Sequence, residues 1–137
     1  MATSENVAAV RDFVERAWNA GDASVFDEHL APDFAHPGGR EGFKALVFGF
    51  RSAFPDFELE VHDMFGAGEK VVTRFTMRGT HDGEFMGIAA TGRRVEFDGI
   101  AIDVMRDGQR VDGWAQLDRL GLLKALGVVD APPSVQR

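Results

Sequence analysis

One carboxylate interrupts an otherwise apolar stretch of this chain: Asp103, within GIAIDVM at residues 99–105. A short apolar run of this kind predicts a β-strand, in which neighbouring side chains point to opposite faces. Asp103 then shares a face with Phe97 and Ala101, and the opposite face is apolar as well. A carboxylate on a covered strand must be paired, hydrogen-bonded or held neutral. A neutral carboxyl can donate a hydrogen bond to a substrate carbonyl whose oxygen becomes an enolate.

A structural ion pair is the alternative for Asp103. An arginine such as Arg74, Arg94 or Arg119 could neutralise the carboxylate without any chemistry, because structural ion pairs also perturb carboxyl groups. The sequence leaves both interpretations open.

The chain has four histidines. His36 lies in a predicted loop before Pro37, and a histidine that reaches a pocket is a suitable general base, whereas a solvated loop histidine is the alternative. His81, beside a Gly-rich turn, is expected to brace a strand end, and His29 and His62 are expected at the surface. No set of histidines has the spacing of metal ligands, so no metal is expected.

The hydrophobic periodicity predicts the elements that position these residues. Helices are expected at 4–19, at a short segment between Asp22 and Pro32, at 41–54 and at 119–126; strands are expected from Phe57 and at 70–80, 93–105 and 109–117. Helices followed by antiparallel strands predict an α+β fold, with helices packed on one face of a curved sheet. Such a sheet can wrap into a cone with a pocket in its mouth.

Composition narrows the function classes. The length of 137 residues predicts one domain, at residues 1–127, followed by a flexible tail at 128–137. The net charge of −7 disfavours nucleic acid and anionic membranes as partners. The absence of cysteine excludes disulfides and thiolate chemistry. Without a signal-peptide pattern or a membrane-spanning apolar run, a cytoplasmic location is expected.

Several short motifs carry a family resemblance. They are WNAGD at 18–22, FPD at 54–56, GTH at 79–81, GEFMGI at 83–88, TGR at 91–93, and Asp107-Gly108 followed by Trp114 and Asp118. With them the chain resembles the nuclear-transport-factor-2-like α+β cone, and within it the SnoaL-like polyketide cyclase family, from about residue 7 to residue 127. The resemblance implies an enzyme without cofactors that acts on an apolar carbonyl compound of polyketide or steroid type. It also implies a homodimer through the outer sheet face, which carries Ile100, Ile102 and Trp114.

The chain departs from this family at two positions. The cyclases carry an Asp on the last strand and a His on the preceding strand, and the matching positions are Ala115 and Ala101. The last-strand Asp of limonene-epoxide-hydrolase-like relatives also falls on Ala115. A local similarity to ketosteroid isomerases fits better: their general-base Asp before a proline matches His36, and their neutral strand Asp matches Asp103. Their Tyr donor has no counterpart, because the chain has no Tyr.

These observations predict a cofactor-independent cyclase or isomerase that abstracts a proton next to a carbonyl, with His36 as base and Asp103 as enolate-stabilising acid. The expected ligand contacts are Trp18, Phe50, Phe54, His81, Phe85, Met86, Phe97, Ala101 and Ala115. The main alternative is a non-catalytic module of the same fold that binds a small molecule or forms dimers. A hydrolase is disfavoured, because the sequence offers no second pocket carboxylate.

Overall fold

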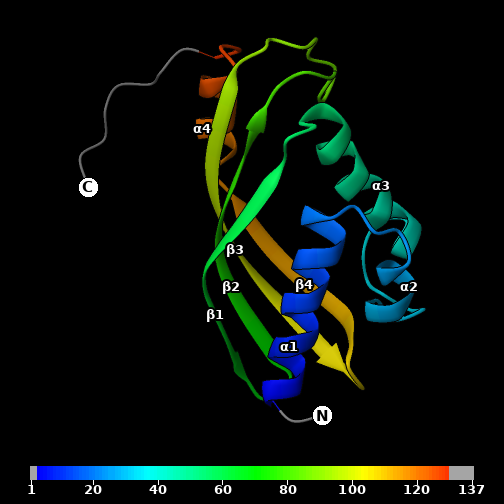
Figure 1. Cartoon of the computed structure of the whole chain (residues 1–137). Helices are drawn as coiled ribbons and strands as arrows, with labels where there is room; N and C mark the ends of the chain where they lie inside the picture. The colour runs from blue at the N-terminus through cyan, green and yellow to red at the C-terminus, as the bar shows by residue number, and fades with distance from the viewer. Residues whose placement is uncertain (1–2, 130–137) are drawn as a thin grey trace.

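The computed structural model describes residues 3–129 of the chain (Figure 1). The elements are α1 (Thr3–Phe13), the π-helical segment η1 (Val14–Asn19), α2 (Val25–His29), α3 (Gly39–Ala53), β1 (Glu58–Ala67), β2 (Lys70–Thr80), β3 (Arg94–Arg106), β4 (Gln109–Leu117) and α4 (Arg119–Ala125). The predicted order of helices and strands is confirmed. The tail residues 130–137, which the sequence predicts to be flexible, lie outside the described part of the chain.

The four strands form one antiparallel sheet in the order β1-β2-β3-β4. The sheet is curled but not closed, and α1, α2 and α3 lie on its concave side (Figure 1). This arrangement confirms the predicted α+β fold with helices on one face of a curved sheet. Between residues 3 and 129, no helix combines the length and the apolar character needed to cross a membrane.

The two faces of β3 differ in exposure within the single chain, whereas the apolar residues on both faces predicted a strand covered on both sides. Phe97 and Asp103 are buried on the concave face, whereas Ile100 is 51% exposed on the convex face. Trp114 of β4 is 57% exposed there as well, so helices do not cover the convex face at these positions. The homodimer expected through this face stays a prediction.

The segment between β2 and β3 is attached to the end of α3. The backbone N–H groups of Asp82 and Gly83 both donate to the Ala53 carbonyl, at 3.0 Å each. A Cβ atom on Gly83 would lie only 2.6 Å from the Ser52 carbonyl oxygen, so this close approach requires glycine. The attachment holds residues 81–92 over one end of the concave face.

Candidate functional site

A cavity of about 240 Å³ lies between the concave face of the sheet and the helices α1, η1 and α3. Most of the side chains that line it are apolar, among them Phe13, Trp18, Phe43, Phe50, Phe75 and Met77. The polar ones are His36, Thr73, Asp103 and Arg110. An apolar chamber with a few polar groups is the usual composition of a small-molecule site.

Small residues on the sheet make room for the cavity. Thr73, Ala101 and Ala115 are cross-strand partners on β2, β3 and β4, and all three line it. Two residues after Ala101, on the same face of β3, Asp103 lies opposite Gly113 of β4. Ala101 and Ala115 are also the positions at which the family resemblance places the His and the Asp of the cyclases. The structure therefore brings these two positions together, and both carry only a methyl group.

Asp103 forms a buried ion pair with Arg110 of β4. The Asp103 Oδ1 and Arg110 Nε atoms are 2.7 Å apart, and the two side chains are only 8% and 17% exposed. A Cβ atom on Gly113 would lie 2.4 Å from Arg110 Nη2, so glycine at that position leaves room for the guanidinium. Burial raises the pKa of the Asp103 carboxyl, and the positive charge of Arg110 opposes that rise.

Arg110 is therefore the partner of Asp103, in place of the arginines that the sequence suggested. Arg74 pairs with Asp63 and Arg94 with Asp56, both at exposed positions.

The signal for Arg110 was present in the sequence. A two-residue turn at Asp107-Gly108 places Arg110 opposite Met105, and this pairing is observed. Arg110 is then the diagonal neighbour of Asp103 on the same face. A register shift after Met105, which the sequence does not reveal, then brings Gly113 rather than Asp112 opposite Asp103.

His36 lies on the cavity wall, in the loop between α2 and α3. Its Nδ1 atom is 2.9 Å from the Pro37 carbonyl oxygen. A carbonyl oxygen only accepts hydrogen bonds, so Nδ1 carries the proton and Nε2 of the neutral ring keeps a free lone pair. The loop is anchored on β4 by two backbone hydrogen bonds, from Ala31 to Arg110 and from Ala35 to Val111.

His36 and Arg110 are supported by the same two aromatic rings. The His36 ring stacks on Phe34 and Phe43, with centroid distances of 5.8 and 5.3 Å. The Arg110 guanidinium lies 5.2 Å from the Phe34 centroid and 4.8 Å from the Phe43 centroid. Such cation–π contacts fix the orientation of a guanidinium and add to its stabilisation.

Thr73 is a site residue that the sequence analysis did not identify. It is buried, and its hydroxyl has no hydrogen-bond partner among residues 3–129. A threonine in an alternating strand reads only as a residue with high β-propensity, so no sequence signal marked it. In the cavity it offers both a donor and an acceptor to a ligand.

The structure divides the residues expected to contact a ligand. Trp18, Phe50, Ala101 and Ala115 line the cavity together with His36 and Asp103. The others are found elsewhere. Phe54, Phe85 and Phe97 pack against Phe50 in a filled aromatic cluster, Met86 is 75% exposed, and His81 is fully buried and bonded to Thr91.

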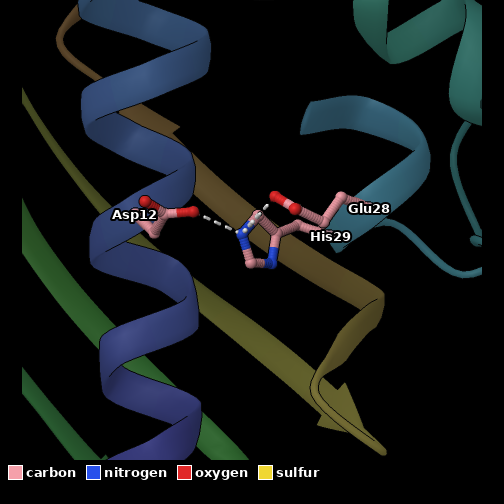
Figure 2. Close-up of side chains that lie close together, drawn as sticks. All are labelled: Asp12, Glu28 and His29. Carbon is pink, nitrogen blue, oxygen red and sulfur yellow. Dashed lines mark hydrogen bonds and ion pairs between the residues drawn. The ribbon is translucent and has the colours of Figure 1, made fainter. Parts of the chain in front are cut away.

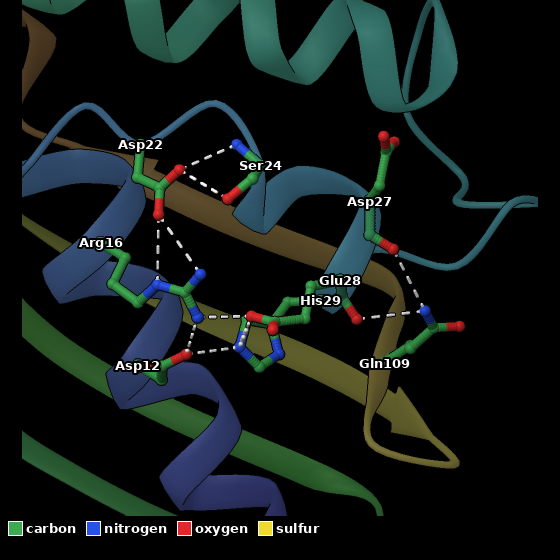
Figure 3. A network of polar contacts seen from close by, with 8 residues as sticks. All are labelled: Asp12, Arg16, Asp22, Ser24, Asp27, Glu28, His29 and Gln109. Atoms are coloured by element: carbon green, nitrogen blue, oxygen red, sulfur yellow. Dashed lines mark hydrogen bonds and ion pairs between the residues drawn. The ribbon is translucent and has the colours of Figure 1, made fainter.

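The residues most suited to hold a metal lie outside the cavity, where α2 approaches α1. Asp12, Glu28 and His29 each offer a ligand atom, and these atoms lie within 4.8 Å of one another (Figure 2). The Arg16 guanidinium contacts both carboxylates and supplies the positive charge that a cation would bring (Figure 3). We therefore assign this cluster as an ion-pair network. His29, expected at the surface, has a side chain that is only 15% exposed.

Comparison with known proteins identifies the same family as the sequence motifs. The family model for SnoaL-like polyketide cyclases matches residues 8–126. The aklanonic acid methyl ester cyclase DnrD of Streptomyces peucetius is 32% identical over 136 residues, which cover 90% of this chain and 92% of the relative. The structure of TsrD from Streptomyces laurentii superimposes with a TM-score of 0.86 at 30% identity, and covers 94% of this chain and 99% of that one. AclR from Streptomyces galilaeus, a candidate hydroxylase, gives 0.85 at 31% identity, with 96% and 87% covered.

Proposed function

Because this chain belongs to the SnoaL-like polyketide cyclase family, we propose that it closes a carbon ring in a polyketide-type carbonyl compound without a cofactor. One observation carries the proposal: His36 and the Asp103–Arg110 pair line the same apolar cavity, and a shared pair of aromatic rings supports them. In this proposal His36 is the base and the Asp103–Arg110 pair binds the oxyanion, at one wall of the cavity.

The reaction is an intramolecular aldol addition. His36 Nε2 removes a proton from the carbon next to a carbonyl group, and the Asp103–Arg110 pair stabilises the enolate oxygen that forms. The enolate carbon attacks a second carbonyl carbon of the same molecule, and the alkoxide takes the proton back from His36. One C–H bond and the π bond of one C=O group are replaced by one C–C and one O–H bond, so no electrons are gained or lost.

Asp103 acts in its protonated form. Its raised pKa allows it to keep a proton and to donate it as a hydrogen bond to the enolate oxygen, next to the positive charge of Arg110. The Thr73 hydroxyl, buried on the same cavity wall, holds the second carbonyl. Double-bond migration would use the same first step, with the proton returned to a different carbon.

Cavity size and the relatives support this substrate class. A volume of about 240 Å³ is below the usual range of roughly 300–1,000 Å³ for drug-sized ligands. Leu46 and Ala115 line the cavity and are exposed, so it opens to solvent beside them. Aklanonic acid methyl ester, the compound in the name of the DnrD relative, would place its reacting carbonyls inside and the rest of the molecule at the opening.

Turnover of aklanonic acid methyl ester and of simpler aromatic β-keto esters tests the proposal, with the ring-closed isomer separated by chromatography. We expect His36→Ala and Asp103→Leu each to lower the rate by about 10²–10⁴-fold. His62→Ala is the matched control, because His62 is exposed and does not line the cavity. Unchanged rates in both cavity variants would exclude this mechanism.

A binding module without catalysis is the second candidate. Ala101 and Ala115 favour it, because they stand where the family resemblance places the polar groups of the cyclases. A ligand that is recovered unchanged, and that binds His36→Ala as tightly as the natural chain, would support this function instead.

A further inference from the structure

A second, much smaller cavity lies next to the Asp103–Arg110 pair. Its volume is about 10 Å³, and a single water molecule needs roughly 10–15 Å³ by the same measure. Asp103 and Arg110 line both cavities, whereas His29 lines only the small one. The ion pair therefore separates the proposed reaction chamber from His29.

Three buried polar atoms belong to residues that line this small cavity. They are His29 Nδ1, Asp103 Oδ1 and Arg110 Nε, and none of them has a hydrogen-bond partner among residues 3–129. Asp103 Oδ1 and Arg110 Nε are in ionic contact at 2.7 Å, but the N–H bond is not aimed at the oxygen. A buried polar group without a partner is destabilising, because it has lost its hydrogen bonds to water. A buried water typically makes about three hydrogen bonds to such groups.

The contacts of His29 on the side away from the small cavity determine which of its ring nitrogens donates a hydrogen bond. His29 Nε2 lies 2.7 Å from Asp12 Oδ2 and 3.3 Å from Glu28 Oε2 (Figure 2). Hydrogen bonds from His29 and Arg16 lower the pKa of Asp12, so its carboxylate is ionised and only accepts. Nε2 therefore carries the proton in the neutral ring, and Nδ1 is an acceptor.

We propose that one water molecule occupies the small cavity, donates to His29 Nδ1 and Asp103 Oδ1, and accepts from Arg110 Nε. Through this water His29 links the surface carboxylate Asp12 to the buried carboxyl of Asp103. His29 is then a positioning residue that controls the proton on Asp103. The assignment rests on the proposed function only in that Asp103 is the acid it serves.

Proton transfer along this path is balanced. Protonated His29 gives its Nδ1 proton to the water, and the water gives one of its own protons to the Asp103 carboxylate. His29 becomes neutral, Asp103 becomes a carboxylic acid and the water is restored. The charged groups that surround this path are Asp12 and Arg16 of α1, Glu28 of α2, and Arg110 of β4. The path enters from outside the main cavity, so the protonation of Asp103 can equilibrate with solvent while substrate is bound.

An NMR titration of the folded chain tests the inference without any substrate. The carboxyl carbon of Asp103 and the ring nitrogens of His29 are followed together against pH. We expect the Asp103 signal to show its own inflection and a second one at the pH where the His29 ring titrates.

Ala9→Val is the decisive variant, because Ala9 lines the small cavity and the two added methyl groups would displace the water. We expect the second inflection of Asp103 to be lost while His29 still titrates. A direct electrostatic effect of His29 on Asp103 would preserve that inflection, and this result would overturn the proposal.

His29→Gln, which keeps a polar side chain but cannot titrate, should also lose the second inflection. His62→Gln removes an exposed histidine and should retain it. An inflection that survives in His29→Gln would likewise overturn the proposal. A chain that closes no ring but shows the coupled titration would disprove the proposed function and leave the water-linked path intact.

Discussion

Phenylalanine rings lie at both ends of the concave face. At one end they border a cavity, and at the other they pack against one another. At one end, Phe43 lines the hollow site together with His36 and Arg110, and Phe34 stacks on Phe43. At the other end, rings from α3, the β2–β3 connection and β3 pack against one another. Phe50 contacts Phe54, Phe85 and Phe97 there, with centroid distances of 5.2–6.5 Å.

The difference lies in the residues that face the rings. At the filled end the rings of α3 meet other large side chains, Phe85 and Phe97. At the hollow end they face Ala101, Gly113 and Ala115, which cannot reach across the gap. Small residues at these sheet positions therefore leave space that large side chains occupy at the other end. The polar side chains His36, Thr73 and Asp103 lie at the hollow end, where a ligand can form hydrogen bonds with them.

Truncation of the filled end should give the largest loss of stability. Phe54 is fully buried between Phe50, His81 and Phe85. Phe54→Ala removes these contacts and leaves a cavity, so the free energy of unfolding should fall by about 3–5 kcal/mol. Leu46→Ala, at the opening of the hollow end, should cost less than about 1 kcal/mol. Urea denaturation of both variants measures the contrast, and equal losses would contradict the division into two ends.

Removal of Arg110 should destabilise the hollow end by a smaller amount. Arg110→Met leaves the Asp103 carboxyl buried without its positive partner, and an ionised carboxylate in that position typically costs about 3–5 kcal/mol. We expect about 2–3 kcal/mol at neutral pH, because the carboxyl, whose pKa burial already raises, avoids part of this cost by keeping its proton. The double variant Asp103→Asn, Arg110→Met should recover most of the loss. If the double variant is no more stable than Arg110→Met, the buried charge is not the cause.

The free energy of unfolding of Arg110→Met should also depend on pH, in a direction that the pKa of Asp103 determines. The pKa of Asp103 is raised in the folded chain, so the folded state binds the proton more tightly than the unfolded state. Stability from this group is therefore complete below its ordinary pKa of 3.8 and decreases as pH rises through the raised value. Loss of Arg110 raises the folded pKa further and extends the decrease to higher pH. The urea midpoints of the natural chain and of Arg110→Met, measured from pH 4 to pH 8, should converge at low pH. A difference between them that widens toward low pH would contradict a raised pKa of Asp103.

The sequence was sufficient for the fold, because each strand and helix carries its own periodic pattern and turn residues. It was also sufficient to place Asp103 on the inner face of β3, since strand alternation needs no tertiary information. It could not separate Phe50, which lines the cavity, from Phe54, which does not. That difference depends on which residues lie across the gap, and these come from strands distant in sequence. The sequence also gave no sign that His29 and Asp103 border one small cavity.

Filling the hollow end should weaken ligand binding with little effect on the fold. Ala101 lines the cavity between Thr73 and Ala115, and Ala101→Leu extends a side chain into the chamber. We expect at least a tenfold loss of affinity for an aromatic β-keto ester, with a change in the free energy of unfolding below about 1.5 kcal/mol. Titration calorimetry measures the affinity. Ile100→Leu, on the convex face, is the control and should bind normally.

The smallest expected effect concerns the one glycine that faces the ion pair. A Cβ atom on Gly113 would lie 2.4 Å from Arg110 Nη2, and this clash involves the end of a flexible side chain rather than backbone. Gly113→Ala should therefore cost less than about 1 kcal/mol, because the guanidinium can shift while the strand stays in place. The shift separates Arg110 from Asp103, so the carboxyl-carbon titration of Asp103 should move to higher pH even though the fold is unchanged. Gly49→Ala is the matched control: Gly49 lies in α3 with no atom within 4 Å of an added Cβ, and the change should raise helix stability by up to about 1 kcal/mol without moving the Asp103 titration. If Gly113→Ala leaves the Asp103 titration at its original pH, the space above Gly113 does not set the position of the guanidinium, and the small residues of the hollow end serve the cavity alone.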